Sequence, residues 1–366
     1  MLETLKRKWH AGSSTRFTVP FADYSARFKY CRDDGRRAIE FALALRTDAE
    51  AYDYAEATAA EIARLSNIPQ AVGTDSGTSA LAFALQALDL PRNSKILVPA
   101  HTYVATELAA RAAGLEPVWV DCAEDDPHPG VEQYQSALVS GVRAVVAVHL
   151  FGGMGDMKGL ARWCAEKGLP LIEDACQAQG LEGAGTYGLA AAFSLNPTKI
   201  CVGLGNGGLL VSKVKSIRDA ARRLRDPESS GPGGRTPAYL DPLQAGFAAA
   251  QAKVLPKILQ HHAALAAAFT SEVGLPLERP HTYYRLVVGV PDPAKARAAL
   301  KRSGVDARPR LYKPLSRPGE CPNAESYWSR SLAMPIGLHL AEEDMRRAAA
   351  GLRPLLEKRE NSSRLE

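Results

Sequence analysis

The stretch GLPLIEDACQAQG, residues 168–180, combines a short apolar run with two carboxylates at its end. Four apolar or near-apolar residues lead directly into Glu173 and Asp174, as in a strand that is buried on both faces. A buried charge is costly unless another group pairs with it. The partner can be a structural arginine, a metal ion or a cationic ligand, and the rest of the chain has to distinguish these possibilities.

Similar apolar runs recur from about residue 71 and alternate with helical patterns. In SALAFALQAL, Leu81, Ala84, Leu85 and Leu88 fall at helical spacing. Strands that alternate with helices indicate βαβ units, so we predict an α/β fold with a mostly parallel, seven-stranded sheet between helices. The predicted strands are residues 71–74, 95–98, 117–120, 144–150, 170–174, 191–195 and 208–212.

The second part of the chain has a different pattern. A Gly/Pro/Ser-rich stretch at 228–239 precedes a long, alanine-rich helical pattern at about 242–271, and short strands and helices follow it. We therefore expect a large domain over 1–245, a linking helix with a small α+β domain over 246–359, and a disordered tail at 360–366.

Composition narrows the function classes. The net charge is only +5, and the basic stretches at 5–10 and 222–226 are short, so we read them as solvated faces and expect no nucleic-acid partner. The six cysteines show no CxxC pair, which favours neither zinc nor disulfides and suits a reducing cytoplasm. Neither a signal peptide nor a run of about 18 apolar residues is evident, so we expect no membrane partner.

Ligands of open parallel sheets bind beyond the carboxyl ends of the strands. DSGTSAL follows the first predicted strand, where the backbone N–H groups of Ser76, Gly77 and Thr78 at a helix start favour an anion. An ordinary N-cap with nothing bound explains the same residues. Tyr103 follows the second strand, where its ring either stacks on the ring of a ligand or packs against other side chains.

Lys199 follows the sixth predicted strand and precedes the glycine run GLGNGG at 203–208. A loop lysine is commonly a solvated charge, and the glycine run fits a phosphate loop or a flexible turn equally well. Asp174 and Lys199 are close enough in the predicted sheet to face each other across a ligand or to form a direct salt bridge.

One ligand accounts for these residues together. Pyridoxal 5′-phosphate has a phosphate for the helix start, an aromatic ring for Tyr103, a cationic ring nitrogen for Asp174 and a carbonyl for Lys199. An aspartate beside the ring nitrogen favours its protonated form, which makes the ring an electron sink.

The ordered set SGTSAL, VPAHTYVAT, VHLFG, LIEDACQAQG, FSLNPTK and GNGGLLVS resembles the DegT/DnrJ/EryC1/StrS family of fold-type-I, pyridoxal-phosphate-dependent aminotransferases. The resemblance covers about residues 70–215 and is fainter toward the C-terminus. It implies that Lys199 bonds the cofactor covalently and that Asp174 pairs with the ring nitrogen. It also implies that Gln177 approaches the ring's 3-oxygen, that Tyr103 stacks on the ring, and that the phosphate is held by Gly77, Thr78 and Ser194.

The sequence departs from the family pattern around the substrate. Asn206 stands where a glutamate is common, and TPAYLDPLQA at 236–245 lacks the usual Asn-Tyr-Arg segment that the neighbouring subunit donates. Histidines common in the small domain are missing from 308–317. In their place we expect a phosphate or carboxylate of the acceptor ketone to be bound by one or more of Arg235, Arg308, Arg310, Tyr312 and Lys313. Simple solvated loop charges explain the same residues.

The resulting prediction is a homodimeric aminotransferase that moves an amino group from L-glutamate or glutamine to a keto-sugar, cyclitol or other biosynthetic ketone. Lys199 argues against the family's dehydratase branch, in which a histidine replaces the lysine. Elimination or oxidation on the same cofactor remains an alternative, as does a non-catalytic regulatory protein that binds it.

Overall fold

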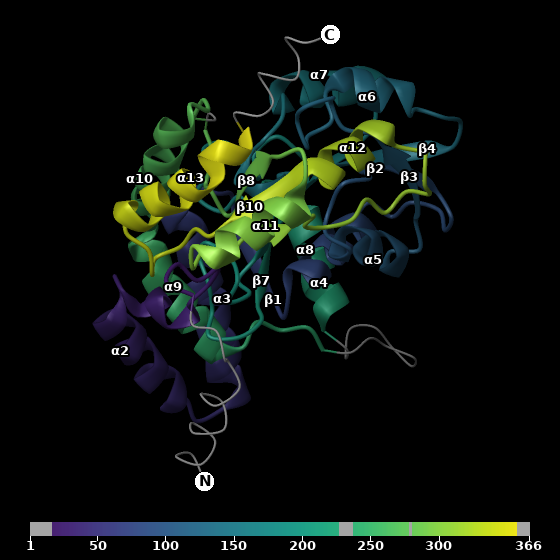
Figure 1. The fold of residues 1–366 in the computed structure, drawn as a ribbon. Helices are drawn as coiled ribbons and strands as arrows, with labels where there is room; N and C mark the ends of the chain where they lie inside the picture. Colours follow the sequence, from purple (N-terminus) through teal and green to yellow (C-terminus); the bar gives the residue numbers. More distant parts are fainter. Residues whose placement is uncertain (1–16, 227–236, 278–279, 357–366) are drawn as a thin grey trace.

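The computed structural model describes residues 17–226, 237–277 and 280–356. Its centre is the expected seven-stranded sheet (Figure 1). The strand order of this sheet is β1-β7-β6-β5-β4-β2-β3. Strands β2 to β6 run parallel, whereas β7 is antiparallel to both β6 and β1. The strands are β1 (Ala71–Thr74), β2 (Lys95–Pro99), β3 (Glu116–Val120), β4 (Val142–Val148), β5 (Leu171–Asp174), β6 (Ala190–Ser194) and β7 (Gly208–Val211).

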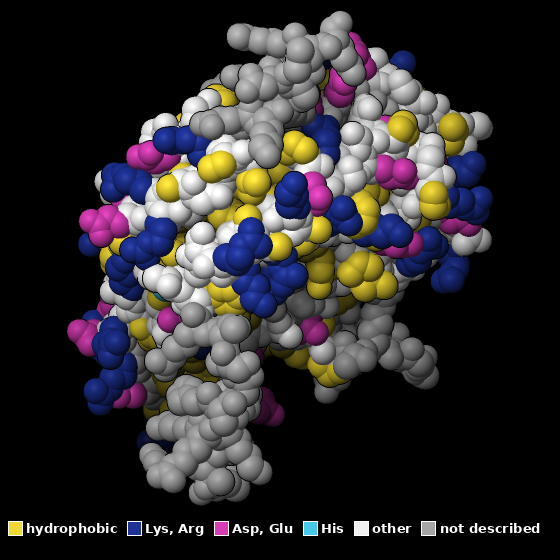
Figure 2. Space-filling view, viewed as in Figure 1, with side chains coloured by type: hydrophobic (Ala, Val, Ile, Leu, Met, Phe, Trp, Pro, Cys, Tyr) yellow, Lys and Arg dark blue, Asp and Glu magenta, His cyan; other side chains and the backbone are white. Residues whose placement is uncertain are grey.

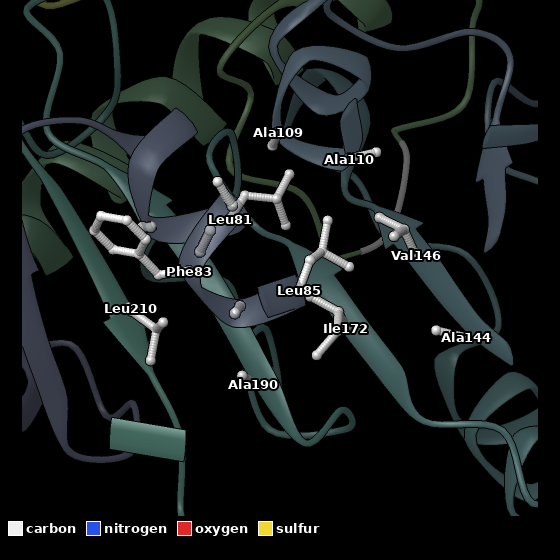
Figure 3. Packing of buried hydrophobic residues seen from close by; sticks show 14 of the residues in the cluster. Leu81, Phe83, Leu85, Ala109, Ala110, Ala144, Val146, Ile172, Ala190 and Leu210 are labelled. Carbon is white, nitrogen blue, oxygen red and sulfur yellow. The ribbon is translucent and has the colours of Figure 1, made fainter. Parts of the chain in front are cut away.

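Helices cover both faces of this sheet. On one face, α4 (Gly77–Gln86), α5 (Ala105–Ala112) and α8 (Lys215–Arg225) share a core with alternate residues of the strands, as the side chains around Leu85 and Ile172 show (Figure 3). On the other face lie α3 (Asp48–Leu65), α6 (Val131–Ser136), α7 (Met157–Lys167) and α9 (Pro242–Lys253). Such two-sided burial explains the nearly continuous apolar runs in the sequence.

The smaller sheet has the order β8-β10-β9 and its own core. It consists of β8 (Leu286–Gly289), β9 (Arg308–Pro309) and β10 (Ser331–Met334), with α11 (Pro293–Arg302) and α13 (Glu342–Leu356) packed on it. Helix α10 (Leu255–Val273) contributes Leu255 to the core of the large sheet and Phe269 to that of the small one. We propose that α10 joins the two domains.

Two expectations from the sequence need correction, one about the long helix at 242–271 and one about the basic stretch at 222–226. The helix predicted over 242–271 is interrupted at Val254, because Pro256 cannot continue the hydrogen bonding of α9 and instead occupies the first turn of α10. In the basic stretch at 222–226, Arg225 is only 2% exposed and its guanidinium bonds Glu56 Oε1 at 2.6 Å, so this residue is not part of a solvated face.

The remaining elements are short or peripheral. They are η1 (Tyr24–Phe28), α2 (Arg32–Leu43), η2 (Leu150–Gly152) and α12 (Pro322–Arg330). Among the described residues, no helix is long and apolar enough to cross a membrane. Lys and Arg side chains are spread over the face shown in Figure 2, with Asp and Glu among them. The basic stretch at 5–10 and the tail at 360–366 lie outside the described residues.

Candidate functional site

A pocket of about 500 Å³ lies at the carboxyl ends of the central strands. It is lined by all seven residues predicted for the cofactor site, which come from the ends of β5 and β6, from the loops after β2, β5 and β6, and from the start of α4. These residues are Gly77, Thr78, Tyr103, Asp174, Gln177, Ser194 and Lys199.

The two carboxylates of β5 point to opposite faces of the sheet, as consecutive strand residues do. Glu173 is fully buried and accepts a bond from His149 Nε2 at 2.8 Å. Backbone N–H groups of the 185–188 loop, at Gly185, Tyr187 and Gly188, donate to its two oxygens at 2.7–2.8 Å. Burial alone raises the pKa of a carboxyl, but these bonds outweigh it and lower the pKa of Glu173. Glu173 is therefore a structural anchor for the loop.

Asp174 lines the pocket and is 8% exposed. Its Oδ2 accepts from Thr106 Oγ1 at 2.7 Å, and its Oδ1 accepts from the N–H of Cys176 at 3.2 Å. Within the described part of the chain, no ion pair joins Asp174 to Lys199 or to an arginine, and no group of three potential ligands could hold a metal. A buried carboxylate placed in this way is suited to a cationic ligand.

The first turn of α4 forms one end of the pocket. Ser76 caps the helix by accepting from the N–H of Ser79 at 3.1 Å, so the expected N-cap is present. Helix geometry leaves the N–H groups of Gly77 and Thr78 without an acceptor inside the helix, and both residues line the pocket. A cap and an anion site are compatible here, because they use different N–H groups.

Two glycines allow the start of α4 to pack closely against the neighbouring strands and loops. A Cβ at Gly77 would lie 2.7 Å from Cys176 Sγ and 2.9 Å from Ser194 Cβ. A Cβ at Gly208, the last residue of the glycine run, would meet the backbone of Ser76 and Gly77. The run is therefore not a loose turn, because its last glycine lets β7 pass directly behind the helix start.

Lys199 is positioned by a turn built on Asn196. The Asn196 Oδ1 accepts from the N–H of Thr198 at 3.0 Å, and the N–H of Lys199 donates to the Asn196 carbonyl at 2.9 Å. Asparagine commonly stabilises such turns through its own side chain. Asn196 Nδ2 also donates to Asn206 Oδ1 at 2.7 Å, so Asn206 supports the lysine loop.

Gln177 and Tyr103 complete the predicted set. Gln177 Oε1 accepts from the N–H of Phe151 at 2.8 Å, which directs the amide group and leaves its nitrogen for the pocket. Tyr103 is 48% exposed, and its ring meets the ring of Tyr312 edge-on at 5.4 Å. Tyr103 thus lies at the mouth of the pocket.

The segment before β8 contributes Tyr284 and Arg285 to the same pocket, and the turn after β9 contributes Tyr312. Sequence reasoning missed the first two, because YYRLVVGV at 283–290 was interpreted only as a strand. Lys199 Nζ lies 4.7 Å from the centre of the Tyr284 ring. Burial raises the pKa of Tyr284, but the positive charges of Lys199 and Arg285 outweigh it and bring the pKa to about 8.

The cations predicted to bind an anion are not in this pocket, although Tyr312 is. Arg308 is half exposed and pairs with Asp306 at 2.8 Å, and Arg310 donates to the Ser329 carbonyl at the surface. Lys313 is exposed, and Arg235 lies outside the described residues. β9 and the turn after it direct the Arg308 and Arg310 side chains to the surface, which agrees with the alternative that they are solvated loop charges.

Comparisons with known proteins agree with this geometry. The model of the DegT/DnrJ/EryC1/StrS aminotransferase family matches residues 40–353. A dTDP-3-amino-3,4,6-trideoxy-alpha-D-glucose transaminase from Streptomyces venezuelae is 30% identical over 378 residues, covering 93% of this chain and 97% of the relative. A UDP-N-acetyl-3-dehydro-alpha-D-glucosamine 3-aminotransferase from Acidithiobacillus ferrooxidans is 28% identical, covering 92% and 98%.

The solved structures give the same result. The crystal structure of S. venezuelae DesV in complex with a ketimine intermediate superimposes with a TM-score of 0.84 at 29% identity, covering 94% of this chain and 99% of that one. The chain therefore belongs to the DegT/DnrJ/EryC1/StrS aminotransferase family and is a pyridoxal-phosphate-dependent aminotransferase.

Proposed function

We propose that this aminotransferase moves the amino group of L-glutamate or L-glutamine to a ketone of a sugar, cyclitol or related biosynthetic intermediate. The observation that carries the proposal is the pocket itself, which joins a lysine, a buried aspartate and the first turn of a helix. The two relatives named above act on nucleotide-linked sugars according to their names, which supports a sugar-like acceptor.

The residues present fit the cofactor. The first turn of α4 and the Ser194 hydroxyl suit its phosphate, because N–H groups at a helix start attract anions. Asp174 is the one carboxylate among the described residues that line the pocket, and it suits the ring nitrogen. When bound, pyridoxal phosphate supplies a carbonyl for the amine and a protonated ring that withdraws electrons from the reacting carbon.

Each side chain then has a distinct task. Lys199 would hold the cofactor covalently, and its amine, once free, would be placed to act as the base that accepts the proton of the donor's Cα. Asp174 keeps the ring nitrogen protonated by opposing its charge. Thr106 donates to Asp174 and so holds the carboxylate in position.

We further propose that two copies of the chain associate. Several large apolar side chains are exposed, among them Phe41 at 56% and Leu43 at 71% at the end of α2. Val104 and Leu108, next to Tyr103 at the pocket mouth, are exposed by 42% and 54%. Exposed apolar side chains of this size are the groups that a contact between two copies would remove from water.

The function is tested with the purified protein and its bound cofactor. Adding L-glutamate or L-glutamine should remove the visible absorbance of the cofactor in the wild type, and candidate ketones should restore it. Lys199→Ala should keep the fold, measured by circular dichroism, but should not complete this cycle. A wild type that responds to neither donor, or a fully active Lys199→Ala protein, would contradict the proposal. Release of ammonia without a new amine would instead indicate an elimination.

A further inference from the structure

Arg285 is an unassigned cation in the pocket. Among the described residues that line it, only Lys199 and Arg285 carry a positive side chain. The Arg285 guanidinium lies 4.1 Å from the centre of the Tyr284 ring, and Lys199 Nζ lies 4.7 Å from the same centre. Both cations therefore lie against the Tyr284 ring.

The guanidinium of Arg285 has only neutral partners. Its Nη1 donates to the Tyr284 carbonyl at 3.0 Å and its Nη2 to the Tyr284 hydroxyl at 3.2 Å. No carboxylate in the described part of the chain forms an ion pair with it, whereas Arg308, which lies over the same Phe21 ring, is paired with Asp306. A half-buried guanidinium without a counter-charge is suited to an anionic ligand, and its planar fork matches a carboxylate.

The backbone of Arg285 is fixed relative to the predicted cofactor contacts. Its N–H donates to the Phe151 carbonyl at 3.0 Å, and the N–H of Phe151 donates to Gln177 Oε1 at 2.8 Å. Phe151 adopts a φ of 59°, a left-handed conformation that is uncommon for a bulky residue. Such conformations persist where the surrounding structure enforces them, frequently at functional sites.

We infer that Arg285 binds the α-carboxylate of the amino donor, a role that rests on the proposed function. Every amino-acid donor carries this group on the carbon that loses the amine. A cation beside Lys199 therefore orients the donor, so that its Cα hydrogen faces the base. The chemistry identifies the ligand as an α-amino acid, and Arg285 excludes amines that lack the adjacent carboxylate.

The first experiment measures discrimination between donors. With holoenzyme, the rate constant for loss of cofactor absorbance is compared for L-glutamate and for L-glutamic acid 1-amide, which lacks the α-carboxylate. The wild type should prefer L-glutamate, and Arg285→Gln should lose this preference by about 10- to 100-fold because a charge-assisted contact is gone. Arg285→Lys should recover part of it, since the charge remains without the fork. Arg308→Gln, the matched control outside the pocket, should behave as wild type.

The second experiment measures binding without turnover. Calorimetric titration of the holoenzyme with glutarate should give a Kd about 10-fold or more weaker for Arg285→Gln than for wild type and Arg308→Gln. Unchanged binding and unchanged donor preference in a folded Arg285→Gln protein would overturn the inference. A loss confined to the ketone half-reaction would overturn it as well, because Arg285 would then bind the acceptor. If the wild type itself reacted with neither donor, the proposed function would fail, and the glutarate titration would still report on Arg285.

Discussion

At the scale of single residues, Glu173 and Asp174 are neighbours in the chain with different surroundings. Four donors surround the oxygens of Glu173 on one face of β5, whereas Asp174 lines the pocket on the other. Replacing each carboxylate by its amide therefore separates stability from chemistry within one strand.

Asp174→Asn should leave the stability nearly unchanged and slow the reaction. The amide keeps the size of the side chain and an oxygen for Thr106, but it no longer opposes the charge of a protonated ring nitrogen. We expect the donor half-reaction to slow by about 10²–10⁴-fold, the range typical of lost proton-transfer assistance. Single-turnover absorbance measurements check this, and a rate equal to wild type would show that Asp174 does not contact the ring.

Glu173→Gln should have the opposite effect: the protein should become less stable, and the reaction should be nearly unchanged. Its NH₂ group would face N–H donors that now bond a carboxylate, which should reduce the free energy of unfolding by about 1–3 kcal/mol at pH 7. The pKa of Glu173 is lowered in the folded state, so its stabilisation is present above the usual carboxyl pKa and is lost as the pH falls through the folded value. Urea unfolding should therefore show a difference between wild type and Glu173→Gln that shrinks below about pH 4.5. A difference independent of pH would mean that folding does not shift the pKa of Glu173.

At the scale of elements, the site depends on how closely β7 approaches the start of α4. The Cβ that alanine adds at Gly208 would meet the backbone of Ser76 and Gly77, which cannot move without displacing the first turn. Gly77 itself is a poor probe of the phosphate, because any side chain there would collide with Cys176 and Ser194 whatever its charge.

Gly208→Ala should therefore lower both stability and cofactor affinity. Overpacking of this kind typically costs about 1–3 kcal/mol. Gly205→Ala, in the same glycine run, is the control, because a Cβ there would meet only the Gln244 side chain at an ordinary 3.4 Å. Thermal unfolding and fluorescence titration with pyridoxal phosphate measure the two effects. Equal behaviour of both variants would show that the first turn of α4 adapts freely.

At the scale of the whole molecule, the part of the site that could be predicted from sequence is the part carried by the large sheet. Strand periodicity places residues such as Asp174 and Ser194, and the carboxyl-end rule brings their loops to one rim. Tyr284 and Arg285 were not predictable in this way. Their place depends on how the small domain packs against the 150–153 turn, and no local pattern encodes that contact.

Other features that differ from the sequence-based expectations have their own causes. Alternation of apolar residues predicts β8, but it does not indicate that the residues before it cross to the pocket. The surface direction of Arg308 and Arg310 follows from the short pairing of β9 with β10, which two residues of sequence cannot specify. The interruption of the long helix, in contrast, has a local cause in Pro256 and could have been predicted.

The contact between the 281–285 segment and the 150–153 turn leads to a further prediction. Thr282 donates through its N–H to the Gly152 carbonyl at 2.9 Å and through its hydroxyl to the Gln177 carbonyl at 3.1 Å. Gly152 has a φ of 99°, and a Cβ there would collide with the Thr282 hydroxyl. Gly152→Ala should therefore separate the 281–285 segment from the large sheet while leaving both hydrophobic cores intact.

Gly152→Ala should affect the 281–285 segment more than the large sheet. Backbone strain and the collision should cost about 1–3 kcal/mol. Amide hydrogen exchange should rise in residues 282–286 and not in β4 or β5, and the KM for the donor should rise more than the Kd for the cofactor, because Arg285 moves while Asp174 and α4 stay. Gly168→Ala is the control, since Gly168 also has a positive φ of 64° but no neighbour within 4 Å of an added Cβ, so strain acts there without a collision and far from the domain contact. Exchange that rises equally throughout the large sheet would show that Gly152 supports the whole fold and not the union of its two domains.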